Sequence, residues 1–87
     1  MARRASANFT WKNLASGVVL LNLADSTYFV LNETASHVWR GILRGETDEQ
    51  LRQGLTEQFD CTPAQAGADF KELIAYMEGE GMLEAAA

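Results

Sequence analysis

The stretch from Thr27 to Ala35 constrains the fold of this chain more than any other segment. It passes from a run rich in aromatic and β-branched residues directly into residues that favour a helix start. A second apolar run, Val18–Leu23, precedes it, and the residues between the two, 24–26, are typical of a turn. The pattern predicts a β-hairpin whose second strand, Thr27–Leu31, leads straight into a helix.

Alternation along Thr27–Leu31 places Phe29 and Leu31 on one face and Tyr28 and Val30 on the other. In a protein of 87 residues, such a strand is expected at the edge of its sheet. An edge strand leaves a row of main-chain N–H and C=O groups free to pair with another chain. Because the sequence has no constellation of catalytic groups, this edge is the best candidate for a functional surface.

The first strand of the hairpin should also turn alternate residues toward the core. We expect the core-facing residues to be Val19, Leu21 and Leu23. Leu20 then shares the outer face with Asn22. The segment 9–11 is a candidate for a further short strand, so we expect a sheet of two or three strands.

Three helices are expected after the hairpin, and each has a recognisable start. Asn32 and the threonines Thr47 and Thr62 suit N-cap positions, Gln50 completes a capping box, and Pro63 suits the first helical position. The apolar stripes that follow these caps are Ala35, Val38, Trp39, Ile42 and Leu43, then Leu51, Leu55 and Phe59, then Phe70, Ile74 and Met77. This order of elements predicts an α+β, winged-helix-like fold with an N-terminal antiparallel β-sheet followed by a three-helix bundle.

The length and composition of the chain allow a single domain. The chain has 87 residues, of which 47% are hydrophobic, and these extend through most of the sequence. We expect residues 1–8 to be a disordered N-terminus, residues 9–84 to form one domain and residues 85–87 to be a loose tail. No apolar run approaches the roughly 20 residues that span a bilayer, and no secretory signal is recognisable, so a cytoplasmic protein is expected.

Neither the histidine nor the cysteine of the chain indicates catalysis. His37 lies on the first predicted helix with no carboxylate or nucleophile predicted beside it, and Cys61 lies in a turn between helices. One cysteine and one histidine do not provide the ligands of a zinc cluster. We therefore predict no catalytic residue, no metal and no cofactor, and a protein that is not an enzyme.

The third predicted helix has an apolar arc wider than the stripe of about 100° that core packing requires. Leu73 and Tyr76 extend the arc beyond the core seam, and Asp69 lies at its end. One interpretation is that the extra width covers the sheet and the neighbouring helices. The other is that these residues line a groove beside the edge strand, where an extended peptide could add to the sheet by main-chain hydrogen bonds.

Three helices with a hairpin also describe a winged-helix DNA-binding protein, with the third helix as its recognition helix. The charged residues of that helix are one cation, Lys71, and the acids Asp69, Glu72, Glu78 and Glu80. The whole chain has a formal net charge of −5. Phosphate contacts and base reading require cations and amides, so the sequence disfavours nucleic acid as a partner. A small winged-helix transcriptional regulator and a self-pairing structural subunit stay as alternatives.

The chain from about Val18 to Leu83 resembles the PqqD family, also called recognition elements of ribosomally synthesised and post-translationally modified peptides (RiPPs). The likeness rests on Tyr28–Ala35, the Val38–Trp39 pair, Gly45–Thr47, the Leu51–Phe59 helix and the pattern from Asp69 to Leu83. Its most specific portion is Leu31-Asn32 followed by Thr34-Ala35 and Val38-Trp39. The remainder is a hydrophobic pattern.

The resemblance implies a peptide chaperone without catalysis of its own. Such a protein binds the leader of a precursor peptide and presents it to a modifying enzyme, such as a radical S-adenosylmethionine (SAM) protein or a leader protease. The pathway could be that of the quinone cofactor PQQ, of a lasso peptide or of another RiPP. Membranes and nucleic acid are not among the expected partners, whereas a homodimer is one alternative.

The resemblance also implies where the leader binds. The leader is expected to add as an antiparallel strand at Thr27–Leu31 and to lie against the third helix. Lys71 is the cation that would meet an acidic leader residue. The implied peptide-binding residues are Thr27, Tyr28, Phe29, Val30, Leu31, Asp69, Lys71, Leu73 and Tyr76.

Overall fold

The computed structural model describes residues 3–15 and 17–85 and contains two small antiparallel sheets and three helices. The elements follow the order β1 (Arg3–Ala5), β2 (Phe9–Leu14), β3 (Gly17–Asn22), β4 (Tyr28–Leu31), α1 (Glu33–Leu43), α2 (Asp48–Phe59), α3 (Pro63–Gly79) and β5 (Leu83–Ala85). The predicted α+β class, with an N-terminal antiparallel sheet before three helices, is confirmed. None of the described helices has the length and apolarity needed to cross a membrane.

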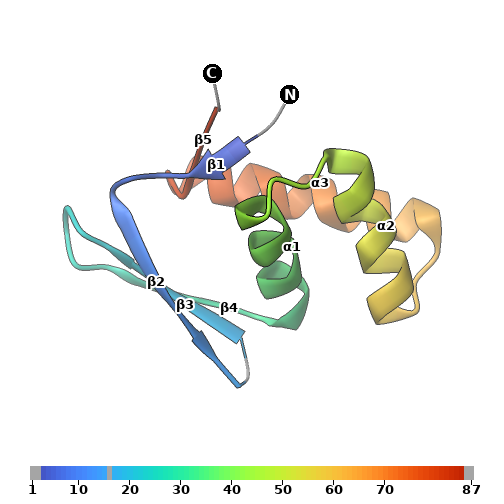
Figure 1. Cartoon of the computed structure of the whole chain (residues 1–87), viewed down its shortest axis with the longest axis horizontal. Coiled ribbons are helices and arrows are strands. Elements are labelled where there is room, and N and C mark those ends of the chain that lie inside the picture. Colours follow the sequence, from blue (N-terminus) through green and yellow to red (C-terminus); the bar gives the residue numbers. More distant parts are fainter. Residues whose placement is uncertain (1–2, 16, 86–87) are drawn as a thin grey trace.

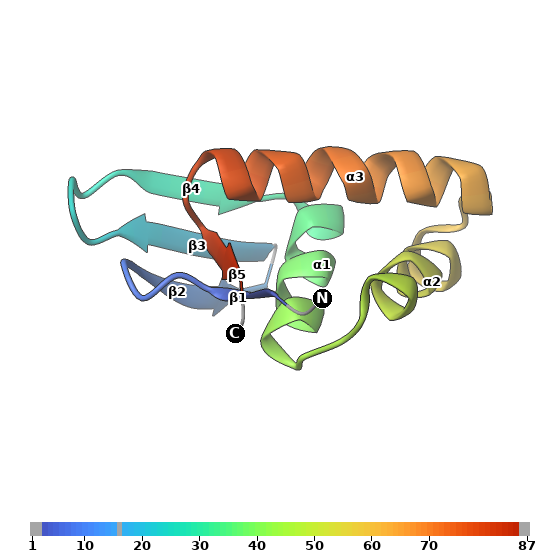
Figure 2. The same cartoon turned by 90° about the horizontal axis from the view of Figure 1, so that it is seen from above.

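The larger sheet has the strand order β2-β3-β4, and the helices cover one of its faces (Figure 1). Helix α1 lies between this sheet and α2, whereas α3 extends along β4 in the view from above (Figure 2). The core is made of buried apolar residues from both sheets and all three helices, among them Val18, Leu20, Trp39, Leu55 and Met77. This packing leaves the opposite face of the larger sheet uncovered.

The helices begin where the sequence predicts. The Asn32 side chain accepts a hydrogen bond from the Ala35 N–H at 2.9 Å, and Thr47 and Gln50 form the capping box at the start of α2. Thr62 caps α3, with Pro63 at its first position. The apolar stripes are buried as expected, except that Phe59 is half-buried and Leu43, at the end of α1, is 40% exposed.

The predicted faces of the first hairpin strand are wrong. Val18 and Leu20 are fully buried, whereas Leu23, which we expected to face the core, is 58% exposed. In the observed register Leu20 lies opposite Phe29 and Val18 opposite Leu31. Residues directly opposite each other in an antiparallel pair share a face, and a shift of one residue moves every side chain to the other face.

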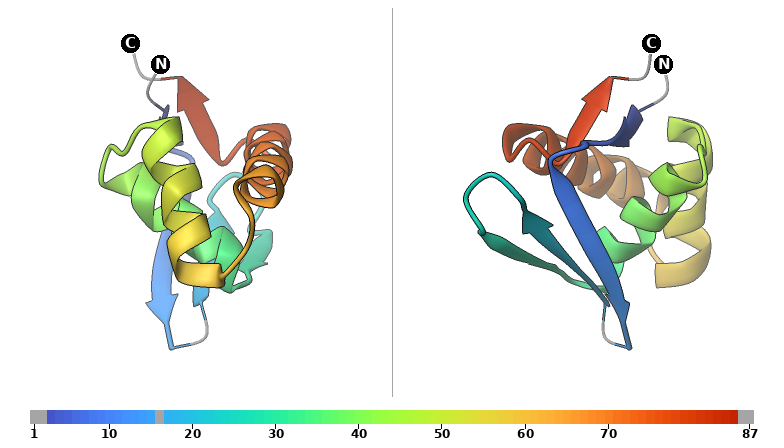
Figure 3. Two further views of the ribbon diagram at one scale, coloured as in Figure 1. Left: turned by 90° about the vertical axis from the view of Figure 1, so that its right-hand side faces the viewer. Right: turned by 60° about the vertical axis from the view of Figure 1, so that its left-hand side comes forward.

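The two chain ends form structure that the sequence analysis did not predict. Arg3–Ala5 is strand β1, so the expectation of a disordered 1–8 segment is wrong for these residues, and Ser6 is buried. β1 pairs with β5, which includes Ala85 of the expected loose tail. Figure 3 shows the two strands side by side at one end of the molecule. Within those two segments, residues 1–2 and 86–87 lie outside the described residues.

Candidate functional site: an open strand edge beside a groove

Strand β4 lies at the edge of the three-stranded sheet, as the sequence predicts. The Asn22 N–H donates to the Thr27 carbonyl at 2.8 Å, so these opposite residues form a hydrogen-bonded pair. Hydrogen-bonded and non-hydrogen-bonded pairs alternate along an antiparallel ladder. In the observed register, Tyr28 and Val30 belong to the non-hydrogen-bonded pairs. Their main-chain N–H and C=O groups therefore point away from β3, toward the open edge.

The side chains of β4 alternate between the core and the uncovered face. Leu31 is buried and Phe29 half-buried against the core, whereas Tyr28 is 69% and Val30 78% exposed. This is the distribution that alternation along the strand predicts.

The turn before β4 fixes where the edge begins. The Asp25 carboxylate accepts a hydrogen bond from the Thr27 N–H at 3.0 Å. Hydrogen bonding with the Thr27 side chain, followed by the bond from its N–H, lowers the pKa of Asp25. Because Thr27 also accepts from Asn22, both of its main-chain polar groups are engaged inside the hairpin. β4 starts one residue later than predicted, and the open edge consists of Tyr28–Leu31.

Ser36 connects the other end of β4 to α1. Its hydroxyl accepts a hydrogen bond from the Val18 N–H at 2.9 Å and donates one to the Leu31 carbonyl at 3.1 Å. The side chain is fully buried. Gly17 lies close by, where an added Cβ would be 2.4 Å from the Leu31 carbonyl oxygen. The end of the edge strand is therefore held in a fixed position relative to the start of α1.

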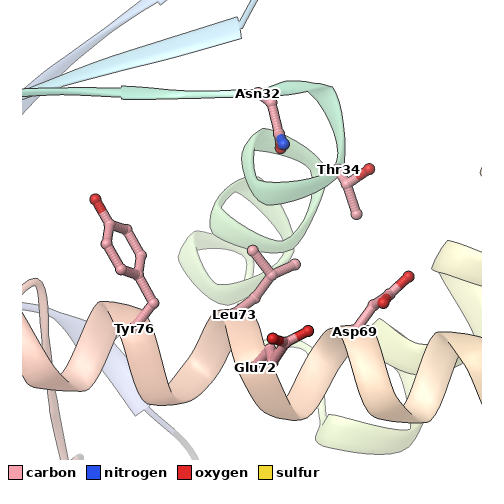
Figure 4. Close-up of a pocket in the computed structure, with 6 residues that line it drawn as sticks. All are labelled: Asn32, Thr34, Asp69, Glu72, Leu73 and Tyr76. Carbon is pink, nitrogen blue, oxygen red and sulfur yellow. The ribbon is translucent and has the colours of Figure 1, made fainter.

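A groove lies between α3 and the junction of β4 with α1 (Figure 4). It has a volume of about 440 Å³. In the close-up, Leu73 and Tyr76 project from α3 toward β4, and Asp69 lies nearer the start of the helix. The residues that line it are Asn32, Thr34, Asp69, Glu72, Leu73 and Tyr76.

The structure brings three of the four predicted α3 residues into this groove. Asp69 and Leu73 are half-buried and Tyr76 is 47% exposed. Lys71, the fourth, is exposed and does not line the groove.

Three residues that line the groove were not predicted from the sequence. Asn32 and Thr34 were assigned only to the start of α1, and Glu72 was counted only among the acids of α3. Nothing in the sequence indicates that the start of α1 faces α3, because that depends on tertiary packing. Glu72 lies at the flank of the apolar arc predicted for the third helix. Only its neighbour Leu73 had indicated a groove there.

His37 and Cys61 lie outside the groove. His37 is half-buried, and its ring lies edge-on to the Phe59 ring with 5.6 Å between the ring centroids. The pKa of His37 is lowered, mainly because burial disfavours the charged form and then because of the nearby charge of Arg44. Cys61 donates a long hydrogen bond to the Leu55 carbonyl at 3.6 Å. Across residues 3–15 and 17–85, no group of three His, Cys, Asp or Glu side chains is placed to hold a metal ion.

Comparison with known protein families shows to which family the chain belongs. The family described as coenzyme PQQ synthesis protein D (PqqD) matches residues 17–83. The chain belongs to the PqqD family. The match includes β3, β4, all three helices and the first residue of β5, so both sides of the groove lie within the PqqD region. The family resemblance seen in the sequence is thereby confirmed.

Solved structures with the same fold include two that are described in complex with leader peptides. One is described as lasso peptide synthetase B1 complexed with the leader peptide, with 24% identity, a TM-score of 0.89 and coverage of 98% of this chain and 100% of that one. Another is TbiB1 in complex with the TbiA(β) leader peptide, with 21% identity, a TM-score of 0.88 and coverage of 97% and 98%. No curated protein matches the sequence.

Proposed function

We propose that this PqqD-family protein is a non-catalytic peptide chaperone. It binds the leader of a ribosomally synthesised precursor peptide by β-strand addition and presents the rest of the precursor to a modifying enzyme. The observation that carries the proposal is the open edge of β4 directly beside a groove on α3. Family membership and a fold shared with two proteins described in complex with leader peptides support it.

The edge of β4 gives a guest peptide a limited number of main-chain contacts. Tyr28 and Val30 direct two N–H and two C=O groups outward, enough for four hydrogen bonds. At a net value of roughly 1 kcal/mol each, these bonds contribute about 4 kcal/mol. A micromolar complex requires about 8 kcal/mol, so guest side chains in the groove must supply the remainder. Leader specificity then depends on the groove.

The partner that acts on the precursor is a separate enzyme. We propose a radical SAM protein or a leader protease, depending on whether the pathway makes PQQ, a lasso peptide or another RiPP. The described residues hold the guest and supply no chemistry, because His37 and Cys61 lie outside the groove and have structural contacts. The protein therefore acts by raising the local concentration of the precursor at the enzyme.

The test is a titration of isotopically labelled protein with the leader of the precursor encoded beside its gene. Amide shifts should concentrate at Tyr28–Leu31 and along the groove face of α3. Val30→Pro should weaken binding at least about fivefold, because it removes an outward N–H whose hydrogen bond contributes roughly 1 kcal/mol. The fold should be kept, because proline is tolerated where a strand N–H faces solvent. Val30→Thr keeps that N–H and is the matched control. Shifts located elsewhere, or full binding by Val30→Pro, would refute strand addition.

Two alternatives predict different results in the same preparation. A transcriptional regulator would bind duplex DNA with strong salt dependence, which the acids of α3 and the net charge of −5 disfavour. A self-pairing subunit would join two copies through β4, so its sedimentation would depend on concentration. Val30→Pro would then shift the oligomeric state instead of peptide binding.

A further inference from the structure

The geometry points to a specific guest: a leader strand with a basic side chain two residues N-terminal to an apolar one. This inference rests on the proposed function and adds the charge and the direction of the guest. It follows from three features of the groove, namely the chain directions on either side of it, the spacing of its residues along α3 and its charges.

The chain directions set the orientation of the guest. β4 and α3 extend in opposite directions on the two sides of the groove (Figure 2). The other pairs of this sheet are antiparallel, and antiparallel pairing is the slightly stronger arrangement. A guest added antiparallel to β4 therefore extends in the same direction as α3. Its N-terminal part lies near Asp69 and its C-terminal part near Tyr76 (Figure 4).

The spacing along α3 matches the repeat of an extended strand. Asp69 and Leu73 are four residues apart, which corresponds to roughly 6 Å along the helix axis. Side chains on one face of a strand repeat every two residues, or roughly 6.7 Å. A guest residue that contacts Asp69 is thus followed, two residues later, by one that contacts Leu73. The next residue on that face reaches Tyr76.

The charges of the groove set the chemistry of the first guest position. Asp69 and Glu72 line the groove together, and within residues 3–15 and 17–85 no Arg, Lys or His lies within salt-bridge distance of either. Lys71, the basic residue between them in sequence, does not line the groove. A guest Lys or Arg would meet two carboxylates, whereas a guest Asp or Glu would be repelled.

The residues that line the rest of the groove favour an apolar side chain at the second guest position. Leu73 is half-buried and contacts the core, and Tyr76 presents its ring at the far end of the groove (Figure 4). An apolar guest side chain at this position covers Leu73, and the next residue on the same face of the guest lies near the Tyr76 ring. This assignment reverses the earlier expectation that Lys71 meets an acidic leader residue.

The experiment is a selection from a library of random twelve-residue peptides displayed on phage. Recovered peptides should be enriched in Lys or Arg two residues before Leu, Ile, Val, Phe, Tyr or Trp. A synthetic copy of a recovered peptide should lose about three- to tenfold in affinity when its basic residue is replaced by Gln, because partly exposed ion pairs contribute up to about fivefold each. The loss should shrink as salt increases.

Protein variants separate this inference from the proposed function. The double variant Asp69→Asn with Glu72→Gln should bind the Lys and Gln peptides equally. The control, Glu49→Gln with Glu57→Gln, removes the same charge from exposed positions of α2 and should keep the preference. Recovered peptides that shift Tyr28–Leu31 without any charge preference, or with the basic residue after the apolar one, would overturn the inference alone. Failure to recover any peptide that shifts Tyr28–Leu31 would overturn the proposed function as well.

Discussion

The Ser36 hydroxyl holds the end of the edge strand by two hydrogen bonds, one from the Val18 N–H and one to the Leu31 carbonyl. Ser36→Ala leaves both main-chain groups buried without this partner. We expect the free energy of unfolding to fall by about 1–3 kcal/mol, measured by urea denaturation. Thr56→Ala removes an exposed hydroxyl that also bonds a helix carbonyl and should cost less than about 0.5 kcal/mol. Equal losses in the two variants would contradict the role assigned to Ser36.

His37 makes the stability of the protein depend on pH. Its pKa is lowered from the ordinary value of 6.5, mainly because burial disfavours the charged form. As the pH falls below about 6.5, the unfolded chain binds the proton before the native state does, so the free energy of unfolding decreases until the lowered native pKa is reached. Urea unfolding of the wild type and of His37→Gln at pH 7.5 and 5.5 measures this effect. The wild type should lose more stability than the variant.

At the scale of elements, α3 both completes the core and lines the groove. Leu73→Glu places a charge where the proposed guest would bury an apolar side chain, and burial of such a side chain contributes about 1.5–3 kcal/mol. We expect peptide affinity to fall at least tenfold, measured by calorimetry. Ala75→Glu adds the same charge at an exposed position of α3 outside the groove and should bind normally. Normal binding by Leu73→Glu would show that the groove is not the peptide site.

The helix starts, which are defined by local chemistry, were predictable from the sequence, whereas the faces of β3 and the terminal sheet, which depend on the register and partner of each strand, were not. The caps at Asn32, Thr47 and Thr62 depend on residues at most three positions away, so the helix starts were correct. The faces of β3 depend on its register with β4, and alternation alone allows two choices. The same limit applies to the groove, because Asn32 and Thr34 meet α3 only in the packed protein.

At the scale of the whole molecule, the two ends of the chain close the fold by pairing β1 with β5, which lie about 80 residues apart. Arg3 extends this closure to the helices: it forms an ion pair with Asp48, lies 3.8 Å from the Glu78 carboxylate and stands over the Phe70 ring. No local sequence signal predicts contacts of this kind. The edge of β4, where we propose that the peptide binds, lies on the other sheet, so closure and the proposed peptide binding involve different strands.

Removal of residues 1–5 tests this separation. The truncated protein loses the β1–β5 ladder and the contacts of Arg3, and we expect the free energy of unfolding to fall by roughly 2 kcal/mol, since each lost hydrogen bond contributes about 1 kcal/mol. Arg4→Ala in the full chain removes only an exposed pair with Glu84 and should change stability by less than about 0.5 kcal/mol. Amide exchange should accelerate at Leu83–Ala85, while Phe29 and Leu31, whose N–H groups face β3, keep their protection and peptide affinity is unchanged. A loss of affinity in the folded truncated protein would mean that the terminal sheet positions α3 against the edge strand.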